Sequence, residues 1–477
     1  MITEVEARRA RARRECFSSA RYTGSDVRIL LLATYELGRQ PFGLASPAAW
    51  LRKRGHSVEC RDLSRQTLDE EAVRAAQLIV FYLPMHTATL LALQWTKIVR
   101  AQNPAASLCG CGLYAPLNES HLRAAGFSAI LGPEFEGDLA ALAEEIANGR
   151  RASAGTNGHS RLPRLAFELP DRTGLLQLRK YAHVVLPGGS HRTAGYTEAS
   201  RGCKHLCRHC PIVPVYSGQF RVVPRALVLA DIRQQVAAGA QHITFGDPDF
   251  FNGVTHAVRI VEDLHREFPQ LTYDVTIKVE HLLRHANALP KLAKTGCLFV
   301  TSAVESLDDE VLRKLDKGHT RADFLRALHV CTNSGLALQP TFVPFTPWTT
   351  RDSYLDLLET IGERDLISAV PSIQLAIRLL IPSRSRLLEL SEIAGIVGEF
   401  DATKLVYPWT HSVPAVDDLA ARIFQVVADE EKQKSSRAAI FERIWLTASG
   451  ARTGNPLPLR VRGEPRPVPY LSEPWYC

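Results

Sequence analysis

The sequence lacks any apolar run long enough to cross a bilayer. Its 477 residues are 45% hydrophobic and 22% charged, and both fractions are ordinary for a soluble globular protein. Several arginines fall within residues 1–21, but no apolar segment follows them, as a secretory signal would require. We therefore expect a soluble, cytoplasmic protein with no membrane partner.

Cysteine is scarce as well, because ten cysteines in 477 residues are too few for a disulfide scaffold. Three of the ten nevertheless lie close together, at Cys203, Cys207 and Cys210. Clustered thiols in a chain that is otherwise poor in cysteine indicate a metal site in a reducing compartment.

The sequence also lacks internal repeats at solenoid periods and a strong excess of charge of one sign. Its formal net charge is +7, which is modest for this length and does not by itself predict a nucleic-acid partner. A chain of 477 residues is too long for one ordinary compact domain, so we expect two large domains and a smaller tail.

The first predicted domain covers residues 26–150. Short continuous apolar runs, typical of strands buried on both faces, alternate there with stretches of helical periodicity. Strands are expected at 27–33, 57–60, 78–83, 107–111 and 129–131. This alternation predicts an α/β domain with a doubly wound, flavodoxin-like (Rossmann-like) sheet.

Residues 151–190 are predicted to form a linker, since Gly, Ser, Asn, Pro and Arg are frequent there. A second α/β succession follows over residues 191–400, with strands expected at 195–200, 242–245, 273–279, 298–303, 337–343 and 372–380. These units fit an open, partial (β/α)6 TIM-type barrel. Residues 401–477 are expected to form a helical extension and a tail rich in Pro and Arg.

The clustered cysteines have three and then two residues between them. This spacing differs from the paired Cys-x2-Cys groups of zinc ribbons and from the four-cysteine runs of ferredoxins. Three thiolates on an iron–sulfur cubane leave one iron open to the amino group and carboxylate of a small molecule. Tyr196–Ser200 is expected to be the first barrel strand and Gly202 permits a tight turn, so the cysteines fall where barrel sites are built.

A zinc site is the alternative interpretation of the same cysteines. His205 or His209 would then supply a fourth ligand, as in Cys3His sites. This alternative predicts a colourless protein.

Residues 198–211, Glu-Ala-Ser-Arg-Gly-Cys-Lys-His-Leu-Cys-Arg-His-Cys-Pro, resemble the signature of the radical S-adenosylmethionine superfamily. The first domain resembles the cobalamin-binding domain of its largest, methylase-type class, so that the resemblance covers residues 26–400. It implies a [4Fe-4S] cluster on the three cysteines, which delivers electrons to the sulfonium and yields a 5′-deoxyadenosyl radical. It also implies that His209, at a usually aromatic position, lies near the adenine.

One rim segment is a candidate for binding the methionyl amine of S-adenosylmethionine. After a buried strand the sequence breaks into Gly, Asp and Pro, so Asp247 and Asp249 are expected at the carboxyl rim. The superfamily has a Gly-Gly-Glu-like motif here, and the resemblance gives its role to Gly246 and Asp247, with Asp249 as a second candidate. A turn whose aspartates cap the following helix is the alternative.

Further polar residues are expected at the same rim. Lys278 and Glu280 are predicted to end the third strand, and Glu305 with Ser306 to end the fourth. Similar positions in the superfamily touch the ribose or the carboxylate, and the resemblance implies the same here. The segment from Glu305 is equally consistent with the start of a helix that has acidic residues near its amino end.

The first domain lacks the Asp-x-His-x-x-Gly element whose histidine ligates cobalt in many cobalamin-binding domains. Radical members of the class often lack that histidine, and the resemblance still implies cobalamin. Met85, His86 and Thr87 after the third strand, and Gly110 and Gly112 at the fourth, would surround its nucleotide tail. The alternative is a corrinoid-type fold without a cofactor.

The last residues, Ser-Glu-Pro-Trp-Tyr-Cys from 472 to 477, resemble the tails of a subset of cobalamin-type radical proteins. Those tails continue through a cysteine or selenocysteine pair to Ala-Glu-Pro. Cys477 is therefore a candidate member of a redox-active pair at a recoded UGA codon. A gene ending there in UAA or UAG would contradict this hypothesis.

Together these features predict a radical S-adenosylmethionine enzyme, specifically a cobalamin-dependent methylase of an unactivated carbon or phosphorus centre. Two alternatives stay open: a cobalamin-independent radical cyclase, isomerase or thioether-forming enzyme, and a non-catalytic iron–sulfur electron carrier or regulator. An enzyme of this kind requires a reducing partner such as flavodoxin or ferredoxin. Its substrate, a small molecule or a peptide, is not specified by any motif.

Overall fold

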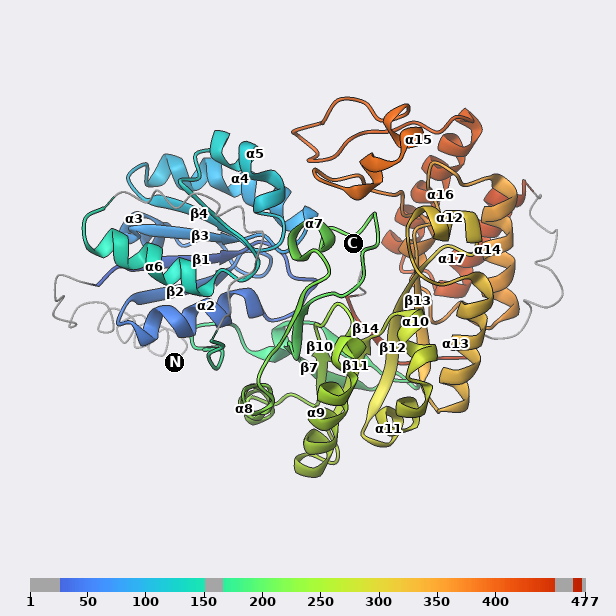
Figure 1. Ribbon diagram of the computed structural model, residues 1–477, viewed down its shortest axis with the longest axis horizontal. Coiled ribbons are helices and arrows are strands. Elements are labelled where there is room, and N and C mark those ends of the chain that lie inside the picture. The colour runs from blue at the N-terminus through green and yellow to red at the C-terminus, as the bar shows by residue number, and fades with distance from the viewer. Residues whose placement is uncertain (1–25, 151–165, 451–465, 474–477) are drawn as a thin grey trace.

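The structure consists of two α/β parts followed by a helical C-terminal region (Figure 1). The computed structural model describes residues 26–150, 166–450 and 466–473. In Figure 1 the N-terminal part lies at the left, the second sheet below the centre and the C-terminal helices at the right. The predicted fold class, a doubly wound domain followed by a partial barrel and C-terminal helices, is confirmed.

A parallel sheet forms the centre of the N-terminal part. Within the described residues its strands are β1 (Arg28–Ala33), β2 (Ser57–Asp62), β3 (Leu78–Tyr82), β4 (Ser107–Cys111) and β5 (Ala129–Leu131). They lie in the order β2-β1-β3-β4-β5, which is the flavodoxin order. The strand order reverses between β1 and β3, and ligands of doubly wound sheets bind at the carboxyl ends of strands at such a point.

Helices cover both faces of this sheet, which explains why the central strands β1 and β3 are almost entirely apolar. One face is covered by α2 (Phe42–Lys53) and α6 (Glu136–Ala147), and the other by α3 (Glu70–Ala75), α4 (His86–Gln102) and α5 (Glu119–Ala124). On β1, Leu31 packs in the first of these layers and Leu30 in the second. Neighbouring residues of a strand point to opposite faces, so both must be apolar.

The second part is built on a curled sheet whose described strands lie in the order β13-β12-β11-β10-β7-β6-β14. The parallel strands are β7 (His191–Thr197), β10 (His242–Phe245), β11 (Thr272–Thr276), β12 (Cys297–Glu305) and β13 (Ala337–Phe342). The strands β6 (His183–Val185) and β14 (Tyr470–Leu471) extend the sheet antiparallel. The last residues of the predicted linker therefore take part in this sheet through β6.

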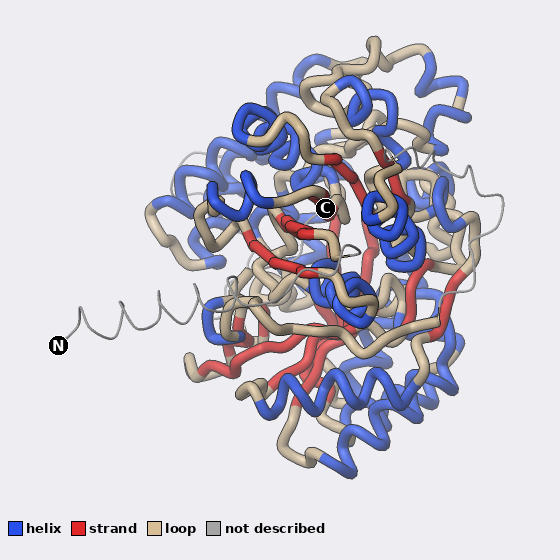
Figure 2. Tube along the Cα trace, turned by 90° about the vertical axis from the view of Figure 1, so that its left-hand side faces the viewer, coloured by secondary structure: helices blue, strands red, loops and turns tan. Residues whose placement is uncertain are grey.

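Helices follow the parallel strands and lie outside the sheet (Figure 2). In chain order they are α8 (Arg225–Ala237), α9 (Val254–Glu267), α10 (Val279–Arg284), α11 (Leu289–Lys294), α12 (Asp309–Lys314), α13 (Arg321–Asn333) and α14 (Arg351–Glu363). Apolar residues of α8, α9 and α13 join those of the strands in one large core. This packing leaves the carboxyl ends of the parallel strands together at one edge, as in TIM-type barrels.

The prediction of a sixth barrel strand at 372–380 is wrong in detail. Ser372–Leu375 forms a 3-10 turn, η5, and after it Arg378 makes an isolated parallel bridge to Phe345 in place of a strand. The side chain of Gln374 explains the difference, because its Oε1 accepts the backbone N–H of Phe342 on β13 at 3.1 Å. A side chain thus takes the hydrogen-bonding position that a sixth strand would need.

The C-terminal helices close one side of the half-barrel. α16 (Pro414–Lys432) and α17 (Arg437–Ser449) pack against each other, and α17 also packs against α14. An irregular segment before them carries η6 (Arg386–Glu389) and α15 (Ser391–Ala394) and packs over α12. The remaining short turns are η1 (Pro116–Asn118), η2 (Leu178–Lys180), η3 (Phe250–Gly253) and η4 (Ala286–Ala288).

Two further sequence predictions concern membrane-spanning helices and the residue Cys477. No helix in the described ranges is long and apolar enough to cross a membrane. The redox and recoding hypothesis for Cys477 lies outside the described residues.

A buried arginine joins the segment between the two parts to both of them. Arg172 forms a two-pronged ion pair with Asp231 of α8, at 2.9 Å from Nε to Oδ1 and 2.8 Å from Nη2 to Oδ2. It also donates to Gln40 Oε1 at 2.6 Å and to the Tyr196 carbonyl oxygen on β7 at 2.7 Å. The Arg172 and Asp231 side chains are 10% and 2% exposed, so loss of one leaves an uncompensated buried charge.

We expect Arg172→Ala to lower the free energy of unfolding by about 3–5 kcal/mol, because Asp231 then stays buried without its cation. Urea denaturation followed by circular dichroism measures the change. Arg179→Ala, at an exposed position of the same segment, is the control. A difference below about 1 kcal/mol between the two variants would show that the pair is no stronger than an exposed one.

Candidate active site

The three clustered cysteines lie on a loop at the carboxyl edge of the half-barrel. The chain leaves β7, forms the short strand β8 (Ser200–Gly202), and then passes through the cysteines into α7 (Val213–Tyr216). β8 pairs antiparallel with β9 (Phe220–Val222), so the loop is closed at its base. All three thiols are free and are buried or partly buried. We call residues 203–210 the cysteine loop.

A glycine is required where the cysteine loop begins. Gly202 has a φ of +76°, and a Cβ there would lie 2.4 Å from the Tyr216 ring and 2.5 Å from the Gln219 carbonyl oxygen. Both the backbone conformation and the lack of space therefore exclude a side chain. The tight turn predicted at Gly202 is present.

Three neighbouring segments hold the cysteine loop. The side chain of Asn252 in η3 accepts a backbone N–H of the loop at 3.2 Å. The Arg208 N–H donates to the Leu315 carbonyl oxygen, just after α12, at 2.9 Å. Arg386 of η6 donates to another carbonyl oxygen of the loop at 2.6 Å. The shape of the loop therefore depends on groups that are distant in the sequence.

Asp247 fixes the turn that precedes the cysteine loop. Its Oδ2 accepts the Ala199 N–H at 2.9 Å, and its Oδ1 accepts the Ser200 hydroxyl. Burial raises the pKa of Asp247 to about 7, although both hydrogen bonds oppose the shift. Gly246 lies beside the Tyr196 ring, where a Cβ would collide with the hydroxyl oxygen. The predicted role of these two residues toward the methionyl amine stays a prediction, and the carboxylate is already bonded within the protein.

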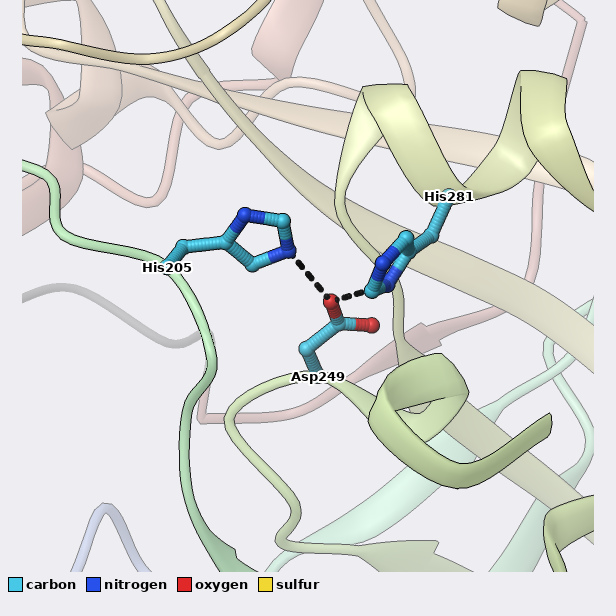
Figure 3. A group of neighbouring side chains, drawn as sticks. All are labelled: His205, Asp249 and His281. Atoms are coloured by element: carbon cyan, nitrogen blue, oxygen red, sulfur yellow. Dashed lines mark ion pairs between the residues drawn. The ribbon is translucent and has the colours of Figure 1, made fainter. Parts of the chain in front are cut away.

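Asp249, the second candidate for that role, lies between two imidazoles (Figure 3). Its Oδ2 is 2.6 Å from His281 Nδ1 and 3.3 Å from His205 Nε2. Burial acts to raise the pKa of Asp249, but the two imidazoles outweigh it and lower the pKa to about 2. No sequence motif marks His281, which α10 brings to the site.

Glu305, at the end of β12, is the centre of a second buried group. Its Oε1 lies 3.1 Å from His209 Nε2 and 3.2 Å from Lys317 Nζ. Burial acts to raise the pKa of Glu305, but the charge of Lys317 and the contact with His209 lower it to about 2. The Glu305 backbone has a φ of +70°, and strained conformations of this kind are concentrated at functional sites.

Two lysines bring positive charge to the thiols. Burial raises the pKa of Cys203, and it raises that of Cys210 to about 12. The ammonium group of Lys278 opposes the shift at Cys203, and that of Lys317 opposes it at Cys210. Both lysines therefore favour the thiolate form that binds iron. Sequence reasoning missed Lys317, which follows α12 in a segment with no recognisable motif.

The other predicted rim residues surround the same edge. β11 ends at Thr276, so Lys278 and Glu280 do not end this strand as predicted; Lys278 precedes α10 and Glu280 lies in its first turn. Ser306 follows β12, and its hydroxyl accepts the Asp308 N–H at 3.1 Å where α12 begins. The backbone of this edge thus turns into helices immediately after each strand.

The donor set fits an iron–sulfur cluster held by three cysteines. The three thiols share one loop, whereas other described cysteines, such as Cys60 and Cys297, are buried in strands. His205 and His209, the alternative fourth ligands of a zinc site, are each directed at a carboxylate. This arrangement favours a cluster with one iron free of protein ligands over a Cys3His zinc site.

A cleft lies between the N-terminal sheet and the residues that flank the cysteine loop. It is lined by Tyr82, Gly112 and Glu136 from the N-terminal part and by Ser200, Gly202 and Gly246 from the half-barrel, among others. The N-terminal residues lie at or just after the carboxyl ends of β3, β4 and β5, where doubly wound sheets bind ligands. The ligand-binding edges of the two sheets therefore meet at this cleft, which we call the interdomain cleft.

Arg201 bridges the two parts beside the interdomain cleft. Its guanidinium pairs with Glu136 of the N-terminal part at 2.7 Å and with Glu198 of the half-barrel at 2.7 Å. The Ser46 hydroxyl also donates to Glu136 Oε1 at 2.6 Å. The second oxygens of Glu134 and Glu136 are buried and have no hydrogen-bond partner among the described residues. Such oxygens are acceptors for a ligand that carries N–H groups.

The two glycines predicted to surround a cobalamin tail have different surroundings. Gly112 lines the interdomain cleft with a φ of +110°, and a Cβ there would lie 2.9 Å from the Leu83 carbonyl oxygen. Gly110 lies within β4, where a Cβ would lie 3.2 Å from the Leu83 side chain and 3.4 Å from that of Phe127. Gly112 therefore allows the backbone at the cleft to approach the end of β3 closely, whereas Gly110 serves packing of the core.

The other predicted tail contacts lie at the start of α4. His86 Nε2 bonds the Lys404 carbonyl oxygen at 2.6 Å, so its ring contacts the segment before α16. Burial lowers the pKa of His86. Met85 packs against the sheet and Thr87 is exposed. The part of these residues in cobalamin binding stays a prediction.

The interdomain cleft fits the chemistry of a corrinoid. Glu136 lines the cleft, and its unpartnered oxygen can accept from the amide groups that a corrin carries at its rim. The residues that would hold the ring therefore come from the loops after β3, β4 and β5.

The family of the chain follows from its central segment. Residues 197–358 match the family model described as the radical SAM superfamily. The match contains the cysteine loop and the strands from β10 to β13. This segment belongs to the radical SAM superfamily, as the cysteine spacing and the resemblance of the sequence predicted. Membership implies a [4Fe-4S] cluster and S-adenosylmethionine.

Curated relatives include enzymes with two kinds of activity. The hopanoid C-3 methylase of Methylococcus capsulatus is 23% identical over 323 residues, which cover 65% of this chain and 62% of that protein. A tRNA-2-methylthio-N(6)-dimethylallyladenosine synthase of Desulfosudis oleivorans is 25% identical over 273 residues, which cover 54% of this chain and 56% of the relative. The chain thus spans between 56% and 62% of the length of these relatives.

Two solved structures share the fold. The radical S-adenosylmethionine methyltransferase TsrM of Kitasatospora setae, with cobalamin and a [4Fe-4S] cluster bound, has a TM-score of 0.57 at 17% identity and covers 71% of this chain and 70% of its own. The cobalamin-dependent S-adenosylmethionine radical enzyme OxsB, with aqua-cobalamin bound, has a TM-score of 0.62 at 13% identity. The match covers 85% of this chain and 67% of the OxsB chain. At these identities the likeness shows a common fold.

We expect Asp247→Ala to reduce the iron that the chain binds on anaerobic reconstitution. Without the carboxylate, the buried Ala199 N–H and Ser200 hydroxyl lose their acceptor, at a cost of about 1–3 kcal/mol each. Iron and sulfide per chain measure the effect, and Ser200→Ala, which removes one of the two bonds, should give an intermediate value. Full iron content in Asp247→Ala would mean that the turn does not depend on this carboxylate.

Proposed function

We propose that this chain is a radical S-adenosylmethionine methylase that binds cobalamin in the interdomain cleft. One observation carries the proposal: Gly202 and Ile212, which flank the cysteine loop, line the same cleft as the carboxyl edge of the flavodoxin-like sheet. A cofactor at the sheet edge would thus be adjacent to the loop at which S-adenosylmethionine is cleaved. The names of the hopanoid C-3 methylase and of TsrM, which both describe methyl transfer, support the proposal.

The three cysteines have the central role in this proposal. Cys203, Cys207 and Cys210 would hold the cluster and leave one iron free for the amino group and carboxylate of S-adenosylmethionine. When bound, the cluster supplies an electron to the sulfonium and cobalamin supplies a methyl group for transfer. A reducing partner such as flavodoxin or ferredoxin would restore the electron.

The charged residues around the loop suit an anionic cluster and a cationic cosubstrate. Lys317 and Lys278 lie close enough to the thiols to offset negative charge in a site of low dielectric. Glu305 holds the ammonium of Lys317 and the ring of His209 in place. His209 would thus present a fixed, flat ring next to Cys210, where the adenine is expected.

Arg201 would set the separation of the two cofactor sites. Its buried pairs with Glu136 and Glu198 tie the N-terminal part to the strand that leads into the cysteine loop. Moving the two parts apart would leave a buried charge without its partner, which is costly. The pairs of Arg201 therefore hold the two parts in one relative position.

The reductive cleavage is tested with the anaerobically reconstituted chain, S-adenosylmethionine and dithionite. We expect 5′-deoxyadenosine, measured by liquid chromatography and mass spectrometry, from the wild-type chain and from Cys331→Ala, whose thiol is buried in α13. Cys207→Ser should form only the background amount, because the cluster loses one of its three ligands. Equal yields from wild type and Cys207→Ser, or no product at all, would leave an electron carrier or regulator as the better explanation.

Cobalamin binding is tested separately, by the cobalt retained after gel filtration with hydroxocobalamin. We expect Gly112→Ala to lower retention at least about tenfold, because its Cβ would lie 2.9 Å from the Leu83 carbonyl oxygen and would displace the backbone that lines the interdomain cleft. Gly55→Ala is the matched control, since Gly55 has a similar φ of +85° with open space around it. 5′-Deoxyadenosine formation without any retained cobalamin would favour a cobalamin-independent radical enzyme.

A further inference from the structure

Two imidazoles and one carboxylate converge next to the cysteine loop (Figure 3). They come from three elements: His205 lies on the loop itself, Asp249 precedes η3, and His281 lies on α10. The atoms His205 Nε2, Asp249 Oδ2 and His281 Nδ1 all lie within 4.8 Å of one another. The fold thus brings together three side chains of metal-ligand type that are spread over 77 residues of the sequence.

These three atoms are buried and lack ordinary partners. Asp249 and His281 are 1% and 3% exposed. Asp249 Oδ1 accepts the Phe251 N–H at 3.1 Å, so Oδ2 is left to face the two rings. Although the separations are 2.6 and 3.3 Å, none of the three atoms has a hydrogen-bond partner of acceptable geometry within the described part of the chain. Buried polar atoms in this condition require another partner.

The donor set matches the requirements of a divalent transition metal. Two imidazole nitrogens and one carboxylate oxygen form the ligand set of many Zn²⁺ sites and of the two-histidine, one-carboxylate Fe²⁺ sites. A metal bound by the three atoms would give each of them the partner that it lacks among the described residues. Three protein ligands also leave a coordination position open for water or another small ligand.

A nearby carboxylate would orient one of the ligands. Glu280 Oε2 lies 3.6 Å from His205 Nδ1, on the side of the ring opposite to Asp249. Histidine ligands commonly have such a carboxylate at their second nitrogen, which fixes the ring and its tautomer. The ring of His285, with its centroid 5.6 Å from that of His281, packs beside the group without belonging to it.

We propose that His205, Asp249 and His281 bind one divalent transition metal ion, separate from the cluster on the three cysteines. His205 lies between Cys203 and Cys207, so the ion would tie the cysteine loop to the carboxyl ends of β10 and β11. It would also engage Asp249, leaving this carboxylate unavailable to the methionyl amine. The proposal does not depend on which radical reaction the chain performs.

The test uses the reconstituted chain, in which iron occupies the cysteine thiols. One equivalent of Zn²⁺ is added anaerobically, the protein is desalted, and zinc and iron are measured by mass spectrometry. Wild type and His285→Ala should retain one zinc per chain. Asp249→Asn and His281→Gln should weaken zinc binding by more than about tenfold while keeping their iron. Asn preserves the cap of η3, so Asp249→Asn removes little besides the ligand.

Co²⁺ in place of Zn²⁺ identifies the ligand atoms. We expect d–d absorption without a thiolate-to-cobalt charge-transfer band, and loss of the absorption in both variants. The proposal is overturned if wild type retains no zinc, if both variants retain it fully, or if the charge-transfer band appears. It is also overturned if Asp249→Asn loses iron in proportion to zinc, since the three residues would then only clamp the loop. Absent 5′-deoxyadenosine with normal zinc binding would contradict the proposed function alone.

Discussion

Three thiols must be held at a fixed separation by a loop that contains no helix or strand of its own. Its shape is therefore imposed from outside, and each contact comes from a different element. Asp247 fixes the turn before the loop, Asn252 and Arg386 bind its backbone, and the segment after α12 receives the N–H of Arg208. The half-barrel is needed for the cluster because it brings these elements to one edge.

The second constraint is the position of the N-terminal sheet relative to that loop. Arg201 fixes this position, because its guanidinium pairs with a buried carboxylate in each part. Arg172 adds a further buried ion pair between the connecting segment and the half-barrel. Buried pairs of this kind fix geometry more than they add stability, because desolvation offsets most of the attraction. A cofactor at the sheet edge and a cosubstrate at the loop would thus keep a constant separation.

The sequence predicted the features that depend on neighbouring residues, such as strands and the cysteine loop. Apolar runs located the strands of the N-terminal sheet and the parallel strands of the half-barrel, the first of them displaced by a few residues, but not β6 and β14. The spacing of the cysteines predicted the cluster and the position of its loop. The sixth barrel strand was predicted wrongly because the side chain of Gln374, not a backbone, bonds the edge of β13. His281 and Lys317 were missed because tertiary packing alone brings them to the cysteine loop. The hydrogen bonds of Asp247 could not be predicted from the sequence either, because the two partners lie 47 and 48 residues away.

The proposed function requires that one iron of the cluster has no protein ligand and is open to S-adenosylmethionine. Electron paramagnetic resonance of the dithionite-reduced, reconstituted chain tests it directly. We expect the signal of a reduced [4Fe-4S] cluster whose g values shift when S-adenosylmethionine is added, because S-adenosylmethionine would bind the open iron. A spectrum that S-adenosylmethionine leaves unchanged, or a preparation with zinc in place of iron and sulfide on the three cysteines, would contradict it.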